Sequence, residues 1–74
     1  MIRLKVKEVA ATQGMSMRKL AKNAGIAYNT LRTLYRDPYR PLSTVTLDKL
    51  ARALNVDASE LIESEDDPNN NHEG

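Results

Sequence analysis

The chain has 74 residues, which suits one small domain without a deep substrate pocket. It contains no cysteine, which excludes disulfide bridges and cysteine-bound zinc as sources of stability. Its formal net charge is only +1, yet residues 1–40 hold nine basic and two acidic side chains, whereas residues 41–74 hold two basic and eight acidic ones. This asymmetry favours a basic face suited to a polyanion, although an ordinary solvated surface is the alternative.

The first stretch, MIRLKVKEVAATQG, has no uninterrupted apolar run, so neither a signal peptide nor a membrane span is expected and the predicted location is the cytoplasm. Its alternation over IRL and the helical spacing that follows predict a short extended lead and a helix over about 5–13. Gly14 suits the positive φ that follows many helix ends. Ser16 is then a typical N-cap for a second helix over about 17–24, which Gly25 ends.

Two further helices are expected on either side of a proline-containing loop. The third covers about 28–36 and ends at Asp37, because the proline that follows disfavours a helical conformation of the residue before it. The fourth has Ser43 or Thr44 as its N-cap, and the periodic leucines and alanines after this cap make the helix amphipathic.

The C-terminal part is predicted to hold a short fifth helix and a tail. Asp57 and Glu60 have the spacing of a capping box, which would open a helix that buries Leu61 and Ile62. Residues 63–74 contain no aliphatic side chain, so they are expected to form a disordered acidic tail. No sheet is expected, and the predicted fold class is all-α with five helices.

The third predicted helix carries the most informative pattern. At about 100° per residue, its apolar side holds Ala27, Leu31, Leu34 and Tyr35, and its opposite side holds Asn29, Arg32, Thr33 and Arg36. The major groove of DNA admits one α-helix, and there Asn pairs with adenine and Arg with guanine through two hydrogen bonds. The polar side therefore suits base reading, with a solvated helix surface as the alternative on this pattern alone.

The segment MRKLAKNAGIAYNTLRTLYR, which starts at Met17, resembles the helix-turn-helix of the Cro/repressor-type family, also called the XRE family. The matching positions are Leu20, Ala21, Ala24, Gly25, Ile26, Leu31 and Leu34. The segment LDKLARALNVDASELIE is similar to the last two helices of that family, so the resemblance covers nearly all of residues 5–63. It implies a compact five-helix, lambda-repressor-like DNA-binding domain over residues 1–62, with the second helix of the motif in the major groove.

The resemblance also implies which residues touch DNA. The residues expected to read bases are Tyr28, Asn29, Arg32 and Thr33. Those expected near phosphates are Ser16, Met17, Arg18, Thr30, Arg36, Tyr39 and Arg40, with packing under its loop as the alternative for Tyr39. Two positions depart from the family pattern: Met17 stands where Gln is frequent and cannot donate a hydrogen bond, and Ala27 replaces the usual hydroxyl or Asn cap.

The expected function is sequence-specific binding of double-stranded DNA as a transcriptional regulator. A homodimer on a near-palindromic site is expected, because one helix reads only a few base pairs. No enzyme is expected: the only histidine, His72, lies in the tail, and no nucleophile elbow, phosphate-binding glycine loop or metal-spaced cluster occurs. No cofactor, metal, membrane or small-molecule substrate is expected either. The alternative function is a protein-interaction or antitoxin-like module that uses the helix-turn-helix as a scaffold.

Overall fold

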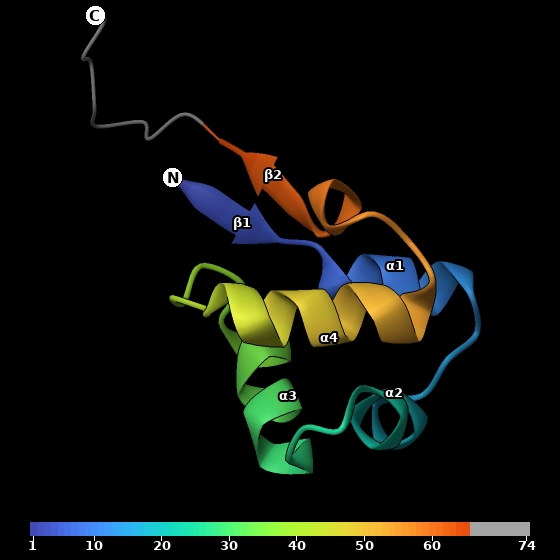
Figure 1. Ribbon diagram of the computed structural model, residues 1–74. Coiled ribbons are helices and arrows are strands. Elements are labelled where there is room, and N and C mark those ends of the chain that lie inside the picture. The colour runs from blue at the N-terminus through green and yellow to red at the C-terminus, as the bar shows by residue number, and fades with distance from the viewer. Residues whose placement is uncertain (66–74) are drawn as a thin grey trace, which may run out of the picture.

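The computed structural model describes residues 1–65 and places four α-helices beside a small two-stranded sheet (Figure 1). In chain order, the elements are β1 (Ile2–Leu4), α1 (Val6–Thr12), α2 (Met17–Ala24), α3 (Tyr28–Arg36), α4 (Thr44–Leu54), the 3-10 turn η1 (Ala58–Leu61) and β2 (Ile62–Ser64). Residues 66–74, which hold His72 and most of the expected tail, lie outside the described residues. None of the described helices is long and apolar enough to span a membrane.

Local signals set the ends of the helices. α2 begins where the Ser16 Oγ accepts a hydrogen bond from the Lys19 backbone N at 3.2 Å, and it ends at Gly25, which has a φ of 71°. α4 begins in the same way, because the Ser43 Oγ accepts from the Thr46 backbone N at 3.1 Å. The predicted ranges of α2 and α3 and the Ser43 cap are therefore confirmed, and each depends on residues that are close in sequence.

The four helices share one aliphatic core. Its largest fully buried side chains are Leu20, Leu31, Leu50, Leu54, Leu61 and Val6. α2 packs against α3 and α4, while α1 packs against α3, α4 and η1. Gln13 adds a polar tie between α1 and α4, because its Nε2 donates to the Leu54 carbonyl oxygen at 2.7 Å. Each buried aliphatic side chain stabilises the fold by about 1.5–3 kcal/mol, so this core holds α3 firmly against α2.

The expectation of five helices and no sheet is wrong. The Asp57 carboxylate accepts from the Ser59 backbone N at 2.9 Å instead of forming the expected capping box with Glu60, and the turn that follows is the 3-10 turn η1. At Ile62 the backbone becomes extended, and β2 pairs antiparallel with β1. The backbone groups of β1 and β2 thus satisfy each other across the sheet, which a short isolated helix at this place would not allow.

The pairing also moves the start of the expected tail. Glu63 lies opposite Arg3, and Ser64 lies opposite Ile2, so both residues belong to β2 and not to a disordered segment. The Met1 carbonyl oxygen also accepts from the Glu65 backbone N at 2.8 Å. The disorder expected of residues 66–74 stays a prediction.

The elements place two different surfaces at opposite ends of the molecule. In Figure 1, α2 and α3 lie on one side of α4, and β1 and β2 lie on the other side. The loop after α3 connects the two regions, because the Leu4 backbone N donates to the Pro38 carbonyl oxygen at 2.7 Å. Because α2 and α3 lie on the side of α4 opposite the sheet, the sheet does not cover the α2–α3 end.

Candidate nucleic-acid interface

A three-residue turn joins α2 to α3 and sets how the two helices meet. Gly25 adopts the left-handed conformation, and the Ile26 backbone N donates back to the Ala21 carbonyl oxygen at 3.1 Å. Ala21 itself is buried in α2, with an exposed fraction of 4%. Ala27 is extended and gives α3 no side-chain cap, as its residue type predicts, but α3 still begins at Tyr28. The turn thus presents the outer side of α3 at the surface.

The two sides of α3 differ as the sequence predicts. Leu31 and Leu34 are buried, with exposed fractions of 0% and 3%. Three polar residues of the other side are exposed, namely Asn29, Arg32 and Arg36, and the neighbouring Thr30 is exposed as well. Thr33 is half-buried, and its Oγ1 donates to the Asn29 carbonyl oxygen at 2.9 Å. The hydroxyl hydrogen of Thr33 is therefore used within the helix, which leaves its methyl group and oxygen lone pairs for an external contact.

Tyr28, which is expected to read bases, also makes contacts within the protein. Its ring is half-buried and packs against the core, and the Arg18 guanidinium carbon lies 5.0 Å from the ring centroid. One face of the ring is therefore covered by a cation from the first turn of α2. Met17 is also half-buried against the core, which matches its inability to donate a hydrogen bond to a phosphate. Sequence reasoning placed Arg18 and Tyr28 on DNA separately and missed their contact.

The charge of this end of the molecule is of one sign. Between Glu8 and Asp37 the chain has no acidic residue, and it has five basic ones, namely Arg18, Lys19, Lys22, Arg32 and Arg36. No salt bridge within residues 1–65 involves any of these five side chains. Their positive charge is consequently free to act on an external anion.

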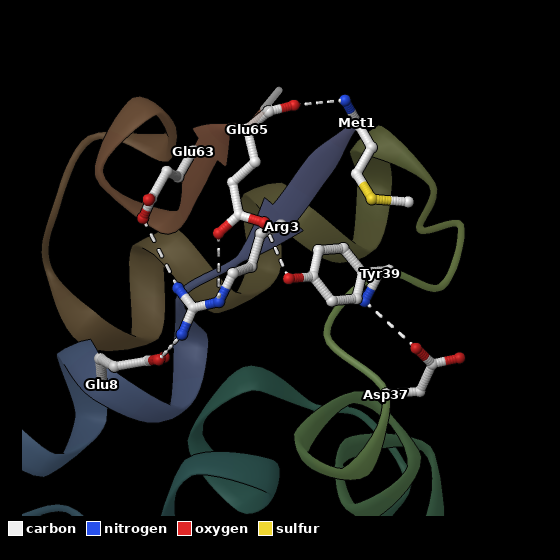
Figure 2. Close-up of polar contacts among 7 residues, drawn as sticks. All are labelled: Met1, Arg3, Glu8, Asp37, Tyr39, Glu63 and Glu65. Atoms are coloured by element: carbon white, nitrogen blue, oxygen red, sulfur yellow. Dashed lines mark hydrogen bonds and ion pairs between the residues drawn. The ribbon is translucent and has the colours of Figure 1, made fainter. Parts of the chain in front are cut away.

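Arg3, a basic side chain at the other end, is paired with carboxylates. Arg3 bonds to Glu8 and also lies 3.5 Å from a Glu63 oxygen and 3.9 Å from a Glu65 oxygen (Figure 2). The hydrogen bond with Glu8 is the main cause that raises the pKa of Arg3, and all three carboxylates add to it. Arg3 therefore does not belong to the free basic charge, although its residue type alone suggests that it does.

Two residues expected near phosphates lie in the loop after α3. Arg40 is exposed there. The Tyr39 hydroxyl instead donates to the Glu65 carboxylate at 2.7 Å, and this hydrogen bond, with some burial, raises the pKa of Tyr39 (Figure 2). Tyr39 is thus drawn into the acidic network around Arg3. The pairing of β1 with β2 brings these residues together, and no short sequence motif predicts this network.

Tyr35 is the third tyrosine and faces inward. It is half-buried against the core, as the sequence predicts, and its hydroxyl has no hydrogen-bond partner among residues 1–65. Burial is the main cause that raises the pKa of this hydroxyl, and the nearby Glu8 contributes as well. Within the same residues, no group of three or more His, Cys, Asp or Glu side chains is arranged to hold a metal ion.

Comparison with known proteins agrees with the geometry. The sequence profile of the Cro/C1-type HTH DNA-binding domain matches residues 5–67. No curated protein matches the chain. The matched span includes all four α-helices and the turn between α2 and α3. The resemblance stated from the residues of the motif is thereby confirmed.

Proposed function

The chain belongs to the Cro/C1-type HTH DNA-binding family, and from this premise we propose that it is a sequence-specific transcriptional regulator that reads the major groove with α3. Asn29 and Arg32 are the proposed principal base readers, with Thr33 offering a methyl contact. The proposed phosphate contacts come from Ser16, Arg18, Thr30, Arg36 and Arg40. The cytoplasmic location expected from the sequence stays a prediction.

The observation that carries this proposal is an exposed polar side of α3 together with unpaired cations on α2 and α3. Asn29 and Arg32 are exposed on α3, and none of the five basic residues between Glu8 and Asp37 is held by a carboxylate within residues 1–65. Neutralising phosphates with such cations releases the counterions of DNA and supplies affinity that does not depend on sequence. The amide of Asn29 and the guanidinium of Arg32 then supply the discrimination between bases.

A homodimer on a near-palindromic site is part of the proposal. Each good two-hydrogen-bond base contact discriminates by only about 1–3 kcal/mol, so one α3 alone selects a site weakly. Two copies whose α3 helices are one turn of DNA apart, about 34–36 Å, would double the number of base contacts. Two exposed apolar side chains, Ile2 at 49% and Val45 at 63%, lie outside α2 and α3, so a contact between copies need not cover the DNA-reading side. Sedimentation with and without DNA tests this.

Selection of binding sites from a random pool of duplexes tests the function. We expect one sequence pattern to be enriched, and we expect the selected duplex to bind at least about 1000-fold more tightly than a scrambled one at physiological salt. Affinity for both duplexes should fall as salt rises. A chain that enriches no pattern and binds all duplexes equally would instead support the alternative of a protein-interaction module that uses the helix-turn-helix as a scaffold.

A further inference from the structure

Arg18 and Tyr28 form the one cation–aromatic contact found within residues 1–65. Arg18 is the second residue of α2, and Tyr28 is the first residue of α3, so the contact bridges the N-terminal ends of the two helices. The Arg18 side chain is exposed, whereas the Tyr28 ring is half-buried and fixed against the core. A fixed aromatic face therefore lies under a long and otherwise flexible cationic side chain.

The position of Arg18 in its helix is electrostatically unfavourable within the protein itself. The N-terminus of a helix carries a partial positive charge, and a cation in the first turn is repelled by it. The first turn of α2 has no acidic residue, and no salt bridge within residues 1–65 compensates Arg18. The same combination of helix terminus and cation attracts an external anion, such as a DNA phosphate.

We propose that Tyr28 is a positioning residue: its ring holds the Arg18 guanidinium toward a DNA phosphate, and the Tyr28 hydroxyl makes no base contact of its own. This inference rests on the proposed function and changes the role that the family resemblance implies for Tyr28. The contact places the Arg18 guanidinium over the ring of Tyr28, and an aromatic ring accepts no conventional hydrogen bond, so the N–H donors that point away from the ring stay free to bind a phosphate.

Two substitutions at Tyr28 separate the ring from the hydroxyl. Tyr28→Phe keeps the aromatic face and removes only the hydroxyl, so we expect its affinity for the selected duplex and for random duplexes to stay within about twofold. Tyr28→Leu keeps an apolar side chain against the core but loses the aromatic face, so we expect affinity for both duplexes to fall by about two- to fivefold. A loss in Tyr28→Phe that equals the loss in Tyr28→Leu and is confined to the selected duplex would overturn the proposal, because the hydroxyl would then be reading a base.

Arg18→Ala and the double variant test whether the ring acts through Arg18. Arg18→Ala should weaken binding to all duplexes and reduce the slope of log K against log salt by about 1, since one phosphate contact is lost. The double variant Arg18→Ala with Tyr28→Leu should bind no more weakly than Arg18→Ala. Independent, additive losses would show that Tyr28 acts on DNA without Arg18 and would overturn the proposal.

A spectroscopic readout keeps the test decisive if Tyr28→Leu is poorly folded. In the free chain, ring-current shifts of the Arg18 side-chain protons should persist in Tyr28→Phe, and their absence in the unaltered chain would overturn the proposal. If the unaltered chain binds no duplex, both the proposed function and the role of Tyr28 are overturned. If the unaltered chain binds DNA and the Arg18→Ala variant has the same salt slope, only the proposed role of Arg18 and Tyr28 is overturned.

Discussion

Arg3 in β1 and the basic residues of α2 and α3 differ in whether carboxylates pair with them. At the β1–β2 end, Arg3 is held by the carboxylates of Glu8, Glu63 and Glu65 (Figure 2). On α2 and α3, five basic side chains have no carboxylate partner within residues 1–65. The small net charge of the chain hides this difference, because it adds paired and unpaired charges together. The unpaired cations on α2 and α3, and not the net charge of the chain, therefore mark the candidate DNA interface.

The largest expected effect is a loss of DNA affinity when the exposed side of α3 is altered. Arg32→Ala and Asn29→Ala should each weaken the selected duplex by about 1–3 kcal/mol and leave random duplexes nearly unaffected, because each removes a base contact. Arg3→Ala is the matched control, since Arg3 is already occupied by carboxylates, and it should leave binding to both duplexes unchanged. Titrations by fluorescence anisotropy measure all three. Equal losses on selected and random duplexes would make Arg32 and Asn29 phosphate contacts.

The next effect is on stability and concerns the turn that sets α3 at the surface. Gly25 has a φ of 71°, and a Cβ placed on it would meet no atom within 4 Å, so the positive φ opposes a substitution here while the Cβ itself meets no crowding. Gly25→Val should therefore lower the free energy of unfolding by about 1–2 kcal/mol. Gly25→Asn should cost less, because Asn tolerates this conformation, as Asn55 shows at the end of α4 with a φ of 57°.

Denaturant titration of the two Gly25 variants separates strain from crowding. A loss for Gly25→Asn as large as that for Gly25→Val would mean that bulk, and not the positive φ, is excluded at this turn. The open space around a Cβ at Gly25 favours the conformational cause.

A smaller effect is expected from the acidic segment beyond the described residues. Deleting residues 66–74 removes Asp66, Asp67 and Glu73 and raises the formal net charge from +1 to +4. If this segment competes weakly with phosphates, deletion should tighten binding to selected and random duplexes alike, by about two- to fivefold at low salt and less at physiological salt. Superimposable curves would leave the segment a role in solubility, and weaker binding after deletion would point to support of dimerisation.

The deletion should begin after Glu65 and not after Ile62. Glu63 pairs with Arg3 across the sheet, and Glu65 accepts from Tyr39, so removing them would disturb the folded domain. A truncation after Ile62 would therefore combine a loss of stability with a change in charge. The truncation after Glu65 changes the charge alone, so comparing the two variants separates these effects on DNA affinity.

The smallest effect is the pH dependence of the hydrogen bond between Tyr39 and Glu65. The bond raises the pKa of Tyr39 above its value in the unfolded chain, so its stabilising effect is present below the unfolded value and is lost as pH rises through the raised value. Tyr39→Phe should therefore lose less stability than the unaltered chain in this alkaline range, as followed by thermal unfolding. At neutral pH it should bind DNA normally, and weakened DNA binding would show that Tyr39 contacts a phosphate after all.

Local signals made part of the fold predictable. Ser16, Gly25 and Ser43 mark helix ends through groups within three or four residues, and the alternation of leucines with polar residues on α3 shows which side faces outward. The sheet was not predictable in this way, because β1 and β2 have three residues each and pair Ile2 with Ser64 across almost the whole described chain. Strands this short give little periodic signal, and the 3-10 turn before β2 imitates the start of a helix.

The candidate site shows the same limit. Residue type and helical spacing place Asn29 and Arg32 on the exposed side of α3, where the structure has them. The contact between Arg18 and Tyr28 depends on how α2 meets α3, and the capture of Tyr39 by Glu65 depends on the sheet. Spacing along one helix carries no information about either contact, so only the packed structure shows which candidate residues are already engaged.

Mapping of backbone amide shifts by nuclear magnetic resonance, during titration with the selected duplex, tests whether α3 and its neighbours bind DNA. We expect the largest changes in residues 16–36, on α2, the turn and α3, and only small changes in the amides of β1 and β2. The largest changes on β1, β2 and the loop around Tyr39, with α3 unaffected, would contradict this expectation.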